Sequence, residues 1–444
     1  MTFEIGLVSR SGPYWDVVSK SHRAEKLTMF LGESSSVSIG NGIGHGLGVV
    51  MSGVLDGVRV LDFGRFIAGP FAATILGDLG ADVIRIERID GGEDRWTTPV
   101  TPDGQGALFL QVGRNKKSVT LNPMKPEGRE IMNALVATAD VVVANLPPDT
   151  RRQMGLDYES LKSLKEDIIV STVTCFGSGG PFSDRVGFDG LAQAMSGAMH
   201  MTGPEGQPTR NSTPYVDFCT GSLLAMATLA ALRHRDLTGE GQELEGALLK
   251  TAMTIANATL IEQDQLEINR EASHNQGQTA APSDTFVTSD GLVLVSVIGN
   301  YQFARWAKLV GRPELADDPR FQNDEGRGNH RNEICGVMSD WCGDKTTDEV
   351  LAALAELKIP GAPVLKPQQT LDHPHVNALG FLERVGYPTA SKDVPISQFP
   401  VAMTGSPGVI RHRAPELGEH TNEVLTELGF TSSEIDDLRS DRII

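Results

Sequence analysis

Hydrophobic positions follow a regular order of strand and helix periods through the first half of the chain. An apolar run over 58–63 predicts a buried strand, helical spacing over 70–80 predicts a helix, and a second apolar run over 81–86 predicts another strand. Two strands joined by a helix form a parallel pair with a right-handed crossover. The pattern therefore predicts that a β-α-β unit opens the ordered part of the chain.

The same alternation continues toward residue 173. A helix over 126–139 leads to a strand over 141–143, and a short helix over 158–164 leads to a strand over 168–173. Strands that alternate with helices imply a parallel sheet covered on both faces. We therefore expect an α/β fold, Rossmann-like but without the glycine fingerprint of that fold.

A second, smaller α/β unit is expected after a break in the pattern. Gly277, Pro282 and polar side chains interrupt the periodicity over 270–290. Proline-rich segments near residues 360 and 374 suggest that the chain then turns back toward the first unit. The remaining expected elements are helices over 190–200, 218–235, 301–310 and 347–357 and a strand over 291–297.

The first 50 residues differ in character from the rest of the chain. They contain a Ser- and Gly-rich stretch, show no sustained periodicity, and lack the order of basic, apolar and small-residue regions that marks a secretory signal. Two interpretations remain open, a flexible extension or an upstream start with Met51 as the natural beginning.

Composition narrows the class of protein. The formal net charge is −18 over 444 residues and the basic residues are scattered, which argues against a nucleic acid partner. The four cysteines lack CxxC spacing, so we expect neither a disulfide framework nor a zinc site, and a reducing cytoplasm fits best. No run approaches the roughly 18 uncharged apolar residues of a membrane span.

The search for catalytic motifs is mostly negative. The sequence has no GxGxxG after a strand, no GxxxxGK[ST], no GxSxG and no HExxH. Nicotinamide enzymes, P-loop kinases, serine hydrolases and zinc peptidases therefore lose support. The ten histidines are dispersed, and no third ligand can be placed beside His373 and His375, so no metal site is predicted.

One carboxylate, Asp217, lies just before the helix expected over 218–235. It is either a helix N-cap, whose oxygens accept unpaired backbone N–H groups, or an ionised nucleophile held beside those groups. The local pattern alone favours the cap.

From Leu55 onward the chain resembles the class III CoA-transferases, the family of formyl-CoA transferase and carnitine CoA-transferase. Many ordered motifs at family-like spacing carry the resemblance, which covers almost everything after Leu55. The motifs are LDGVRVLDF at 55–63, AGP at 68–70, LGADVIRIE at 79–87, NKKS at 115–118, ADVVVAN at 139–145, FGSGGP at 176–181, FDGLAQA at 188–194, TGEGQ at 238–242 and LGEHT at 417–421.

The resemblance implies that Asp217 is the nucleophile of a transferase that moves CoA from an acyl-CoA thioester to a carboxylic acid. An aspartyl anhydride and an aspartyl-CoA thioester would be the covalent intermediates, with coenzyme A as a substrate and no cofactor. Aspartate is ionised at neutral pH and needs no partner base. We expect free N–H groups at the helix N-terminus to stabilise the oxyanion and to lower the pKa of Asp217.

The resemblance also implies a set of binding residues beside CoA. Each of them also has an alternative interpretation. Arg88 is either a contact to CoA or a solvated charge, and Asp189 either orients the site or caps a helix. The remaining residues are either CoA contacts or ordinary loop residues. Three departures put oxalate and formyl chemistry in doubt: Ile67 and Gln153 replace a family glutamine and arginine, and the glycine loop has only Gly277 near it. The implied binding residues are Arg88, Leu121, Asn122, Pro123, Met124, Asn145, Leu146, Met154 and Asp189.

Two rival functions are kept. An α-methylacyl-CoA racemase of the same superfamily needs two acid/base groups, and where such racemases carry a histidine this chain has Phe188, which cannot carry a proton. A CoA-thioester binder without chemistry is the second rival. The identity of the acyl donor and of the acceptor acid cannot be read from these residues.

The family architecture implies an interlocked homodimer of discontinuous domains. We expect a flexible N-terminal extension over 1–50, the first part of a large domain over 51–250, a linker over 251–274, a small domain over 275–370 and a return to the large domain over 371–444.

Overall fold

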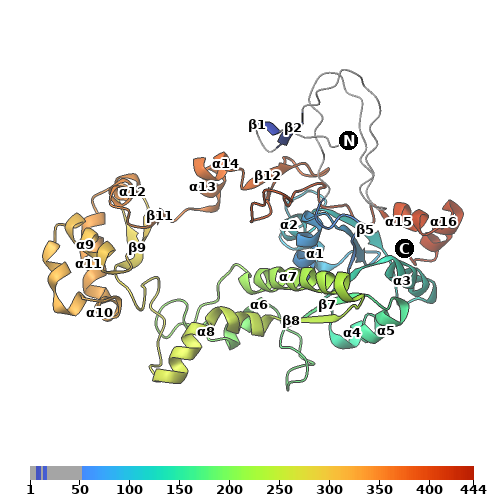
Figure 1. Cartoon of the computed structure of the whole chain (residues 1–444), viewed down its shortest axis with the longest axis horizontal. Helices are drawn as coiled ribbons and strands as arrows, with labels where there is room; N and C mark the ends of the chain where they lie inside the picture. Colours follow the sequence, from blue (N-terminus) through green and yellow to red (C-terminus); the bar gives the residue numbers. More distant parts are fainter. Residues whose placement is uncertain (1–6, 12–13, 18–52) are drawn as a thin grey trace, which may run out of the picture. The chain divides into compact units, whose positions relative to one another are not determined.

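The computed structural model describes residues 7–11, 14–17 and 53–444 (Figure 1). The chain divides into two units, Met1–Gly53 and Val54–Ile444. In the first unit, β1 (Leu7–Ser11) and β2 (Tyr14–Val17) pair as antiparallel strands. The expected flexible extension over 1–50 otherwise lies outside the described residues.

A six-stranded parallel sheet forms the centre of the second unit. Its order is β5-β4-β3-β6-β7-β8. Strand β3 is central, β4 and β5 follow it toward one edge of the sheet, and β6, β7 and β8 follow it toward the other edge. The α/β, Rossmann-like prediction is therefore confirmed. The strands are β3 (Arg59–Asp62), β4 (Asp82–Glu87), β5 (Lys116–Thr120), β6 (Val141–Ala144), β7 (Ile169–Thr174) and β8 (Glu243–Ala247).

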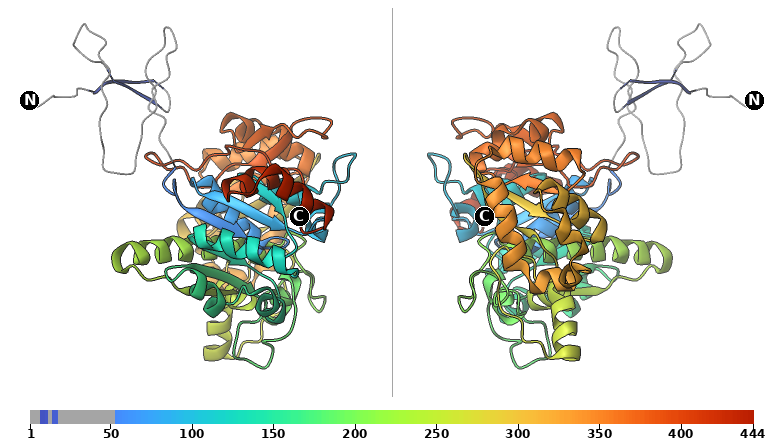
Figure 2. Two further views of the ribbon diagram at one scale, coloured as in Figure 1. Left: turned by 90° about the vertical axis from the view of Figure 1, so that its right-hand side faces the viewer. Right: turned by 90° about the vertical axis from the view of Figure 1, so that its left-hand side faces the viewer.

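Helices cover both faces of this sheet (Figure 2). Successive residues of β6 belong to opposite cores: Val141 and Val143 pack on one face, Val142 and Ala144 on the other. Burial on both faces explains why the strand reads as an uninterrupted apolar run. The first face carries α1 (Ala68–Asp78), α7 (Tyr215–Thr238) and α8 (Leu248–Leu266), and the second carries α3 (Pro126–Thr138), α5 (Tyr158–Leu164), α15 (Thr421–Glu427) and α16 (Ser432–Ser440).

Helix α7 packs closely against α1. A Cβ atom on Gly221 would lie 2.7 Å from the carbonyl oxygen of Ala68, so only glycine permits this approach. By length and composition the 24 residues of α7 would suffice to cross a membrane, contrary to the expectation that no run comes close. Leu224, Ala225 and Leu232 are buried in the core of the sheet, however, and this packing accounts for the apolar composition.

A smaller antiparallel sheet forms in the second half of the chain, in the order β11-β10-β9. Phe286, Val293 and Trp306 are part of its core. The strand and helices expected over 291–297, 301–310 and 347–357 are present. The elements are β9 (Ser283–Val287), β10 (Leu292–Ser296), β11 (Gly361–Pro363), α9 (Asn300–Leu309), α10 (Asp324–Asn329), α11 (Arg331–Cys342), α12 (Thr347–Glu356) and the 3-10 helices Pro313–Asp317 and Pro319–Phe321.

The bounds of the expected linker and of one expected helix differ from the sequence prediction. Residues 251–266 of the expected linker belong to α8, which extends to Leu266. The helix expected over 190–200 is the shorter α6 (Asp189–Met195). The other elements are α2 (Ala107–Val112), α4 (Pro148–Met154), α13 (Pro367–Asp372), α14 (Pro374–Ala378), β12 (Leu382–Val385), β13 (Val394–Ser397) and the 3-10 helix Glu93–Trp96.

Candidate active site

The strand order of the large sheet reverses between β3 and β6. Ligands of open α/β sheets bind at the carboxyl ends of the strands beside such a reversal. Asn145 connects the two loops that emerge there: its Oδ1 accepts the backbone N–H of Arg65 at 2.6 Å, and its Nδ2 donates to the carbonyl oxygen of Arg65 at 2.8 Å. Asn145, expected from the sequence to be a binding residue, thus fixes the backbone of Arg65 at the mouth of the sheet.

Two pockets adjoin at this edge, of about 520 and 270 Å³. Arg65 and Leu146 line both of them. The smaller pocket also contains Asn145, Phe188 and Asp217. Seven of the sequence-predicted residues line the larger pocket: Arg88, Leu121, Asn122, Pro123, Met124, Leu146 and Met154. The structure therefore brings the predicted binding residues together next to the predicted nucleophile.

Asp217 lies inside the first turn of α7 and does not cap it. The helix begins at Tyr215, and its N-cap position is Pro214, which makes no side-chain cap. The capping oxygen comes from Asp189 in α6, whose Oδ2 accepts the backbone N–H groups of Val216 at 2.8 Å and Asp217 at 3.1 Å. The N-cap interpretation of Asp217 is therefore wrong, because a side chain 28 residues earlier supplies the cap.

The N–H groups at the start of α7 already have acceptors. Besides the two bound by Asp189, the N–H of Tyr215 donates to Thr213 at 2.8 Å and that of Phe218 donates to Pro214 at 3.3 Å. The expectation that free N–H groups of this helix would bind an oxyanion is therefore not met in this arrangement. The helix still contributes the positive end of its dipole.

The pKa of the Asp217 carboxyl is raised to about 7, first by burial and then by the negative charge of Asp189. The direction predicted from the sequence was the opposite. That prediction required the helix N–H groups to stabilise the Asp217 carboxylate, whereas they are bound to Asp189. Asp217 therefore keeps its proton to a higher pH than an ordinary aspartate does. Once ionised, a carboxylate of higher basicity is also the stronger nucleophile.

Asp189 is itself held firmly. It is buried, with 7% of its surface exposed, and its second oxygen accepts a hydrogen bond from Nε2 of Gln193. Oε1 of Gln193 in turn accepts the backbone N–H of Asn211 at 3.0 Å. Asp189 is the first residue of α6, and its side chain caps α7, so the alternative interpretation of Asp189 as the cap of the helix that follows it is wrong.

Two other side chains in the smaller pocket limit its chemistry. Phe188 packs edge-to-face on Phe66 with ring centroids 5.5 Å apart and has no proton to exchange. Cys175, which no sequence pattern singled out, also lines this pocket. Burial, aided by the charge of Asp217, raises the pKa of the Cys175 thiol to about 11, so it stays protonated at neutral pH.

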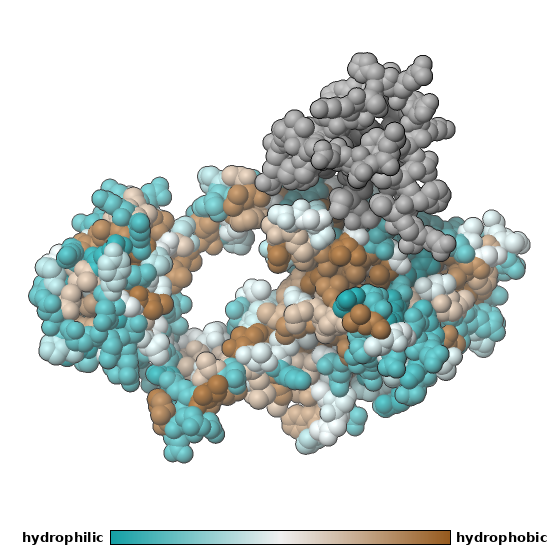
Figure 3. Space-filling view, in the orientation of Figure 1, coloured by the Kyte–Doolittle hydropathy of each residue, from teal (hydrophilic) through white to brown (hydrophobic). Residues whose placement is uncertain are grey.

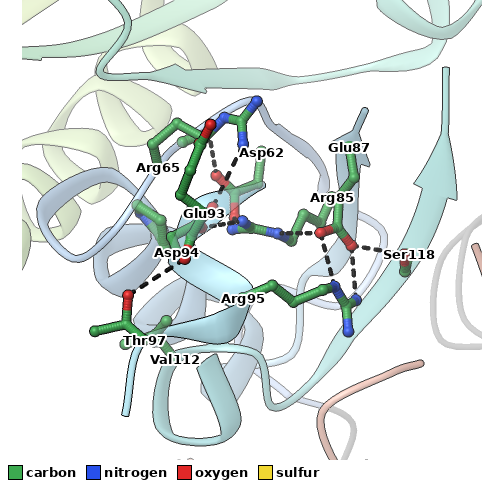
Figure 4. Close-up of polar contacts among 12 residues, drawn as sticks. Asp62, Arg65, Arg85, Glu87, Glu93, Asp94, Arg95, Thr97, Val112 and Ser118 are labelled. Carbon is green, nitrogen blue, oxygen red and sulfur yellow. Dashed lines mark hydrogen bonds and ion pairs between the residues drawn. The ribbon is translucent and has the colours of Figure 1, made fainter. Parts of the chain in front are cut away.

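A buried ion network lies behind the site, and sequence patterning did not reveal it (Figure 4). The Arg85 guanidinium, 2% exposed, forms ion pairs with Asp62 at 3.6 Å, with Glu87 at 3.4 Å and with Asp94. Arg95 binds Glu87 at 2.8 Å. Burial alone would raise the pKa of Glu87, but the charges of Arg85 and Arg95 outweigh it and hold that pKa at about 2.

Lys116 extends the network to β5. Its Nζ donates at 2.7 Å to both Asp62 and the carbonyl oxygen of Pro70. Burial lowers the pKa of Lys116 to about 8 even though Asp62 opposes the shift. These pairs fix the segment around Asp94, whose Oδ1 reaches Nη1 of Arg65 at 3.4 Å (Figure 4).

The fold and the site define a doubly wound α/β protein with a partly buried carboxylate, Asp217, in a pocket at the strand reversal. Residues 55–421 match the model of CoA-transferase family III, and the chain belongs to this family. The resemblance seen in the sequence motifs is thereby confirmed.

Named relatives cover nearly the whole chain. The succinyl-CoA–L-malate CoA-transferase beta subunit of Chloroflexus aurantiacus is 36% identical over 398 residues, which are 88% of this chain and 98% of that protein. The succinyl-CoA:glutarate CoA-transferase of Mus musculus is 34% identical over 385 residues, 84% of this chain and 86% of that protein. Among solved structures, a CAIB/BAIF family protein from Brucella suis superposes with a TM-score of 0.75 at 30% identity, covering 85% of this chain and 100% of its own.

Proposed function

We propose that this chain transfers CoA from an acyl-CoA thioester to a carboxylic acid through covalent intermediates on Asp217. The observation that carries the proposal is the position of Asp217: a carboxylate with a pKa of about 7 in a pocket that adjoins the larger, predicted CoA pocket. The Asp217 carboxylate and the thioester of an acyl-CoA bound in the larger pocket would meet in the smaller pocket. Family membership supports the same reaction class.

The proposed reaction has four balanced steps. Ionised Asp217 attacks the thioester carbonyl, which gives an aspartyl mixed anhydride and releases CoA thiolate. The thiolate attacks the aspartyl carbonyl, which releases the donor acid and leaves an aspartyl-CoA thioester. The acceptor carboxylate attacks that thioester to form a second anhydride and release CoA thiolate again. The thiolate then attacks the acceptor's acyl carbonyl, giving the new acyl-CoA and free Asp217.

The larger pocket is proposed to hold CoA. It opens beside Arg88, whose side chain is 53% exposed and pairs with Asp90 at 3.2 Å and Glu93 at 3.4 Å. A phosphate would displace these exposed carboxylates, because pairs in solvent contribute little and a bidentate contact to phosphate contributes more. The backbone and apolar side chains of 121–124 would face the pantetheine.

We propose succinyl-CoA as the donor and a short dicarboxylic acid as the acceptor. The support is that two relatives covering most of this chain are named for succinyl-CoA, with malate and glutarate as their acceptors. A racemase reaction has weaker support, since Phe188 stands on the pocket wall where a second acid/base group would be needed.

We also propose that the chain works as a cytoplasmic homodimer with interlocked subunits. Support comes from α8, where only Leu248, Thr251 and Ala252 are buried in the described chain. Apolar side chains of this helix are exposed beside polar ones (Figure 3). Ile255 is 52% exposed and Ile261 is 55% exposed, a surface that a second copy would cover.

Trapping the activated aspartate tests the proposed function. We expect that incubation with succinyl-CoA and hydroxylamine converts Asp217 to a hydroxamate, which peptide mass spectrometry locates. Asp184, an exposed carboxylate on the same pocket, serves as the internal control and should stay unmodified. Absence of a hydroxamate at Asp217 during turnover, or equal labelling of Asp184, contradicts the mechanism.

A further inference from the structure

Arg65 occupies a position shared by the two pockets. It comes after β3, it lines both cavities, and its backbone N–H and carbonyl are fixed by the side-chain amide of Asn145. Its guanidinium lies 3.4 Å from Asp94 and is 25% exposed. The side chain is therefore anchored on one side and open to the pockets on the other.

The network behind Arg65 leaves a positive charge without a matching carboxylate. Its cations are the four side chains Arg65, Arg85, Arg95 and Lys116, and its anions are the three carboxylates Asp62, Glu87 and Asp94. The other three cations are at most 2% exposed. Asp94 is shared between Arg65 and Arg85, and Arg65 is the one of the four cations with a partly exposed side chain, on a residue that lines both pockets.

The smaller pocket places this charge beside the acyl group. In the proposed function, an acyl chain bound to CoA or to Asp217 occupies that pocket, whose wall includes Arg65. Its volume of about 270 Å³ suits a short acyl chain. A carboxylate at the far end of such a chain would be costly to bury without a cation, and guanidinium is the best-matched partner.

We propose that Arg65 is the specificity-determining residue for a dicarboxylic acyl group, binding its distal carboxylate while Asp94 holds the guanidinium in place. This inference rests on the proposed function. Arg185 is the other cation on this pocket, but it is exposed and stacks on Phe182, with its guanidinium carbon 3.7 Å from the ring centroid. Arg185 is therefore the matched control.

Gly92 offers a second way to perturb Arg65 without removing its charge. A Cβ atom at Gly92 would overlap Nη1 of Arg65 and crowd Asp94. The backbone at Gly92 has φ −102° and ψ 156°, which alanine adopts without strain. Gly92→Ala should therefore displace the guanidinium and leave the backbone unchanged.

The test compares succinyl-CoA with butyryl-CoA, which has the same chain length but no distal carboxylate. We expect Arg65→Gln to lower kcat/KM for succinyl-CoA by about 10- to 100-fold, with Gly92→Ala causing a smaller loss and Arg185→Gln less than about twofold. Calorimetric affinity for butyryl-CoA, which does not require turnover, should be unchanged in all three. Arg65→Lys should restore part of the loss.

Three results overturn the inference. They are unchanged succinyl-CoA kinetics in Arg65→Gln, a loss of butyryl-CoA affinity of similar size, which would assign Arg65 to CoA itself, and a loss of succinyl-CoA kcat/KM reproduced by Arg185→Gln. If circular dichroism shows that the Arg65→Gln variant is unfolded, the same kinetic comparison is made with Gly92→Ala. Failure of the proposed function is distinguishable, because then the unsubstituted protein forms no hydroxamate at Asp217 with any donor.

Discussion

Asp189 caps the helix that carries Asp217, accepting the backbone N–H of Asp217 itself at 3.1 Å and that of Val216 at 2.8 Å. The contact has two electrostatic effects on Asp217. It occupies donors that would otherwise stabilise the Asp217 carboxylate, and it adds a negative charge nearby. Together with burial, this arrangement keeps the pKa of Asp217 at about 7.

The pH dependence of the reaction should report this pKa. Only ionised Asp217 attacks a thioester, so kcat/KM for the donor should rise about tenfold per pH unit below 7 and level off above it. Steady-state rates from pH 5.5 to 8.5 measure the profile. A profile that stays flat over this range would mean that Asp217 ionises as an ordinary carboxyl.

Replacing Asp189 should move that profile. Asp189→Asn removes the negative charge, so we expect the acidic limb to shift by about one unit toward lower pH. Asp184→Asn removes an exposed charge from the same pocket and should leave the limb in place. If the pH–rate profiles of the Asp189→Asn variant and the parent protein overlap on their acidic side, Asp189 acts on α7 only as a cap.

Neutralising Asp217 separates binding from chemistry. Asp217→Asn should lower kcat by about 10⁴-fold or more, because every covalent step passes through this carboxylate. Affinity for CoA, measured by calorimetry, should change little, since the larger pocket does not include Asp217. Turnover close to that of the parent protein would refute the catalytic role, and retained affinity without any parent activity would support a binding protein.

The same substitution should change stability with pH in a defined direction. The folded-state pKa of Asp217 is raised above its ordinary value, so the folded protein binds more protons than the unfolded chain between about pH 4 and 7 and loses stability as pH rises through that window. Asp217→Asn should therefore gain stability relative to the parent at pH 8, by a few kcal/mol at most, and the gain should vanish near pH 4. Urea unfolding at both pH values measures the difference. A gain that is independent of pH would point to packing.

Proton exchange distinguishes transfer from racemisation. With Phe188 on the pocket wall, we expect no deuterium to enter the α-carbon of a 2-methylacyl-CoA in D₂O when no acceptor acid is present. NMR of the recovered thioester provides the measurement. Rapid wash-in under these conditions would favour the racemase.

The large fold was predictable because its central strands are buried on both faces, which makes runs such as Val141–Ala144 uniformly apolar. The strands at the two ends of the sheet, β5 and β8, were missed. Lys116 in β5 is a buried charge that pairs with Asp62, and Glu243 and Glu245 in β8 are exposed on an edge. Their strand character depends on neighbours far along the chain.

The candidate site, too, was predictable only in part. The sequence motifs located Asp217 and the residues of the larger pocket, but the start predicted for α7 and the direction predicted for the pKa shift of Asp217 were wrong. Both errors come from Asp189, which lies in another helix and whose contact with α7 no local pattern encodes. The ion network around Arg85 was invisible for a similar reason, since its partners come from β3, β4 and the 3-10 helix Glu93–Trp96.

The contact between Gly221 and Ala68 has a consequence for substrate length. Arg65 lies just before α1 and Asp217 lies in the first turn of α7, so the packing of these two helices sets the span between the proposed carboxylate anchor and the proposed nucleophile. Any side chain at Gly221 would push the helices apart and lengthen that span. Under the proposed function, the missing side chain of Gly221 therefore limits the length of the acyl chain that fits between Arg65 and Asp217, although Gly221 lines neither pocket.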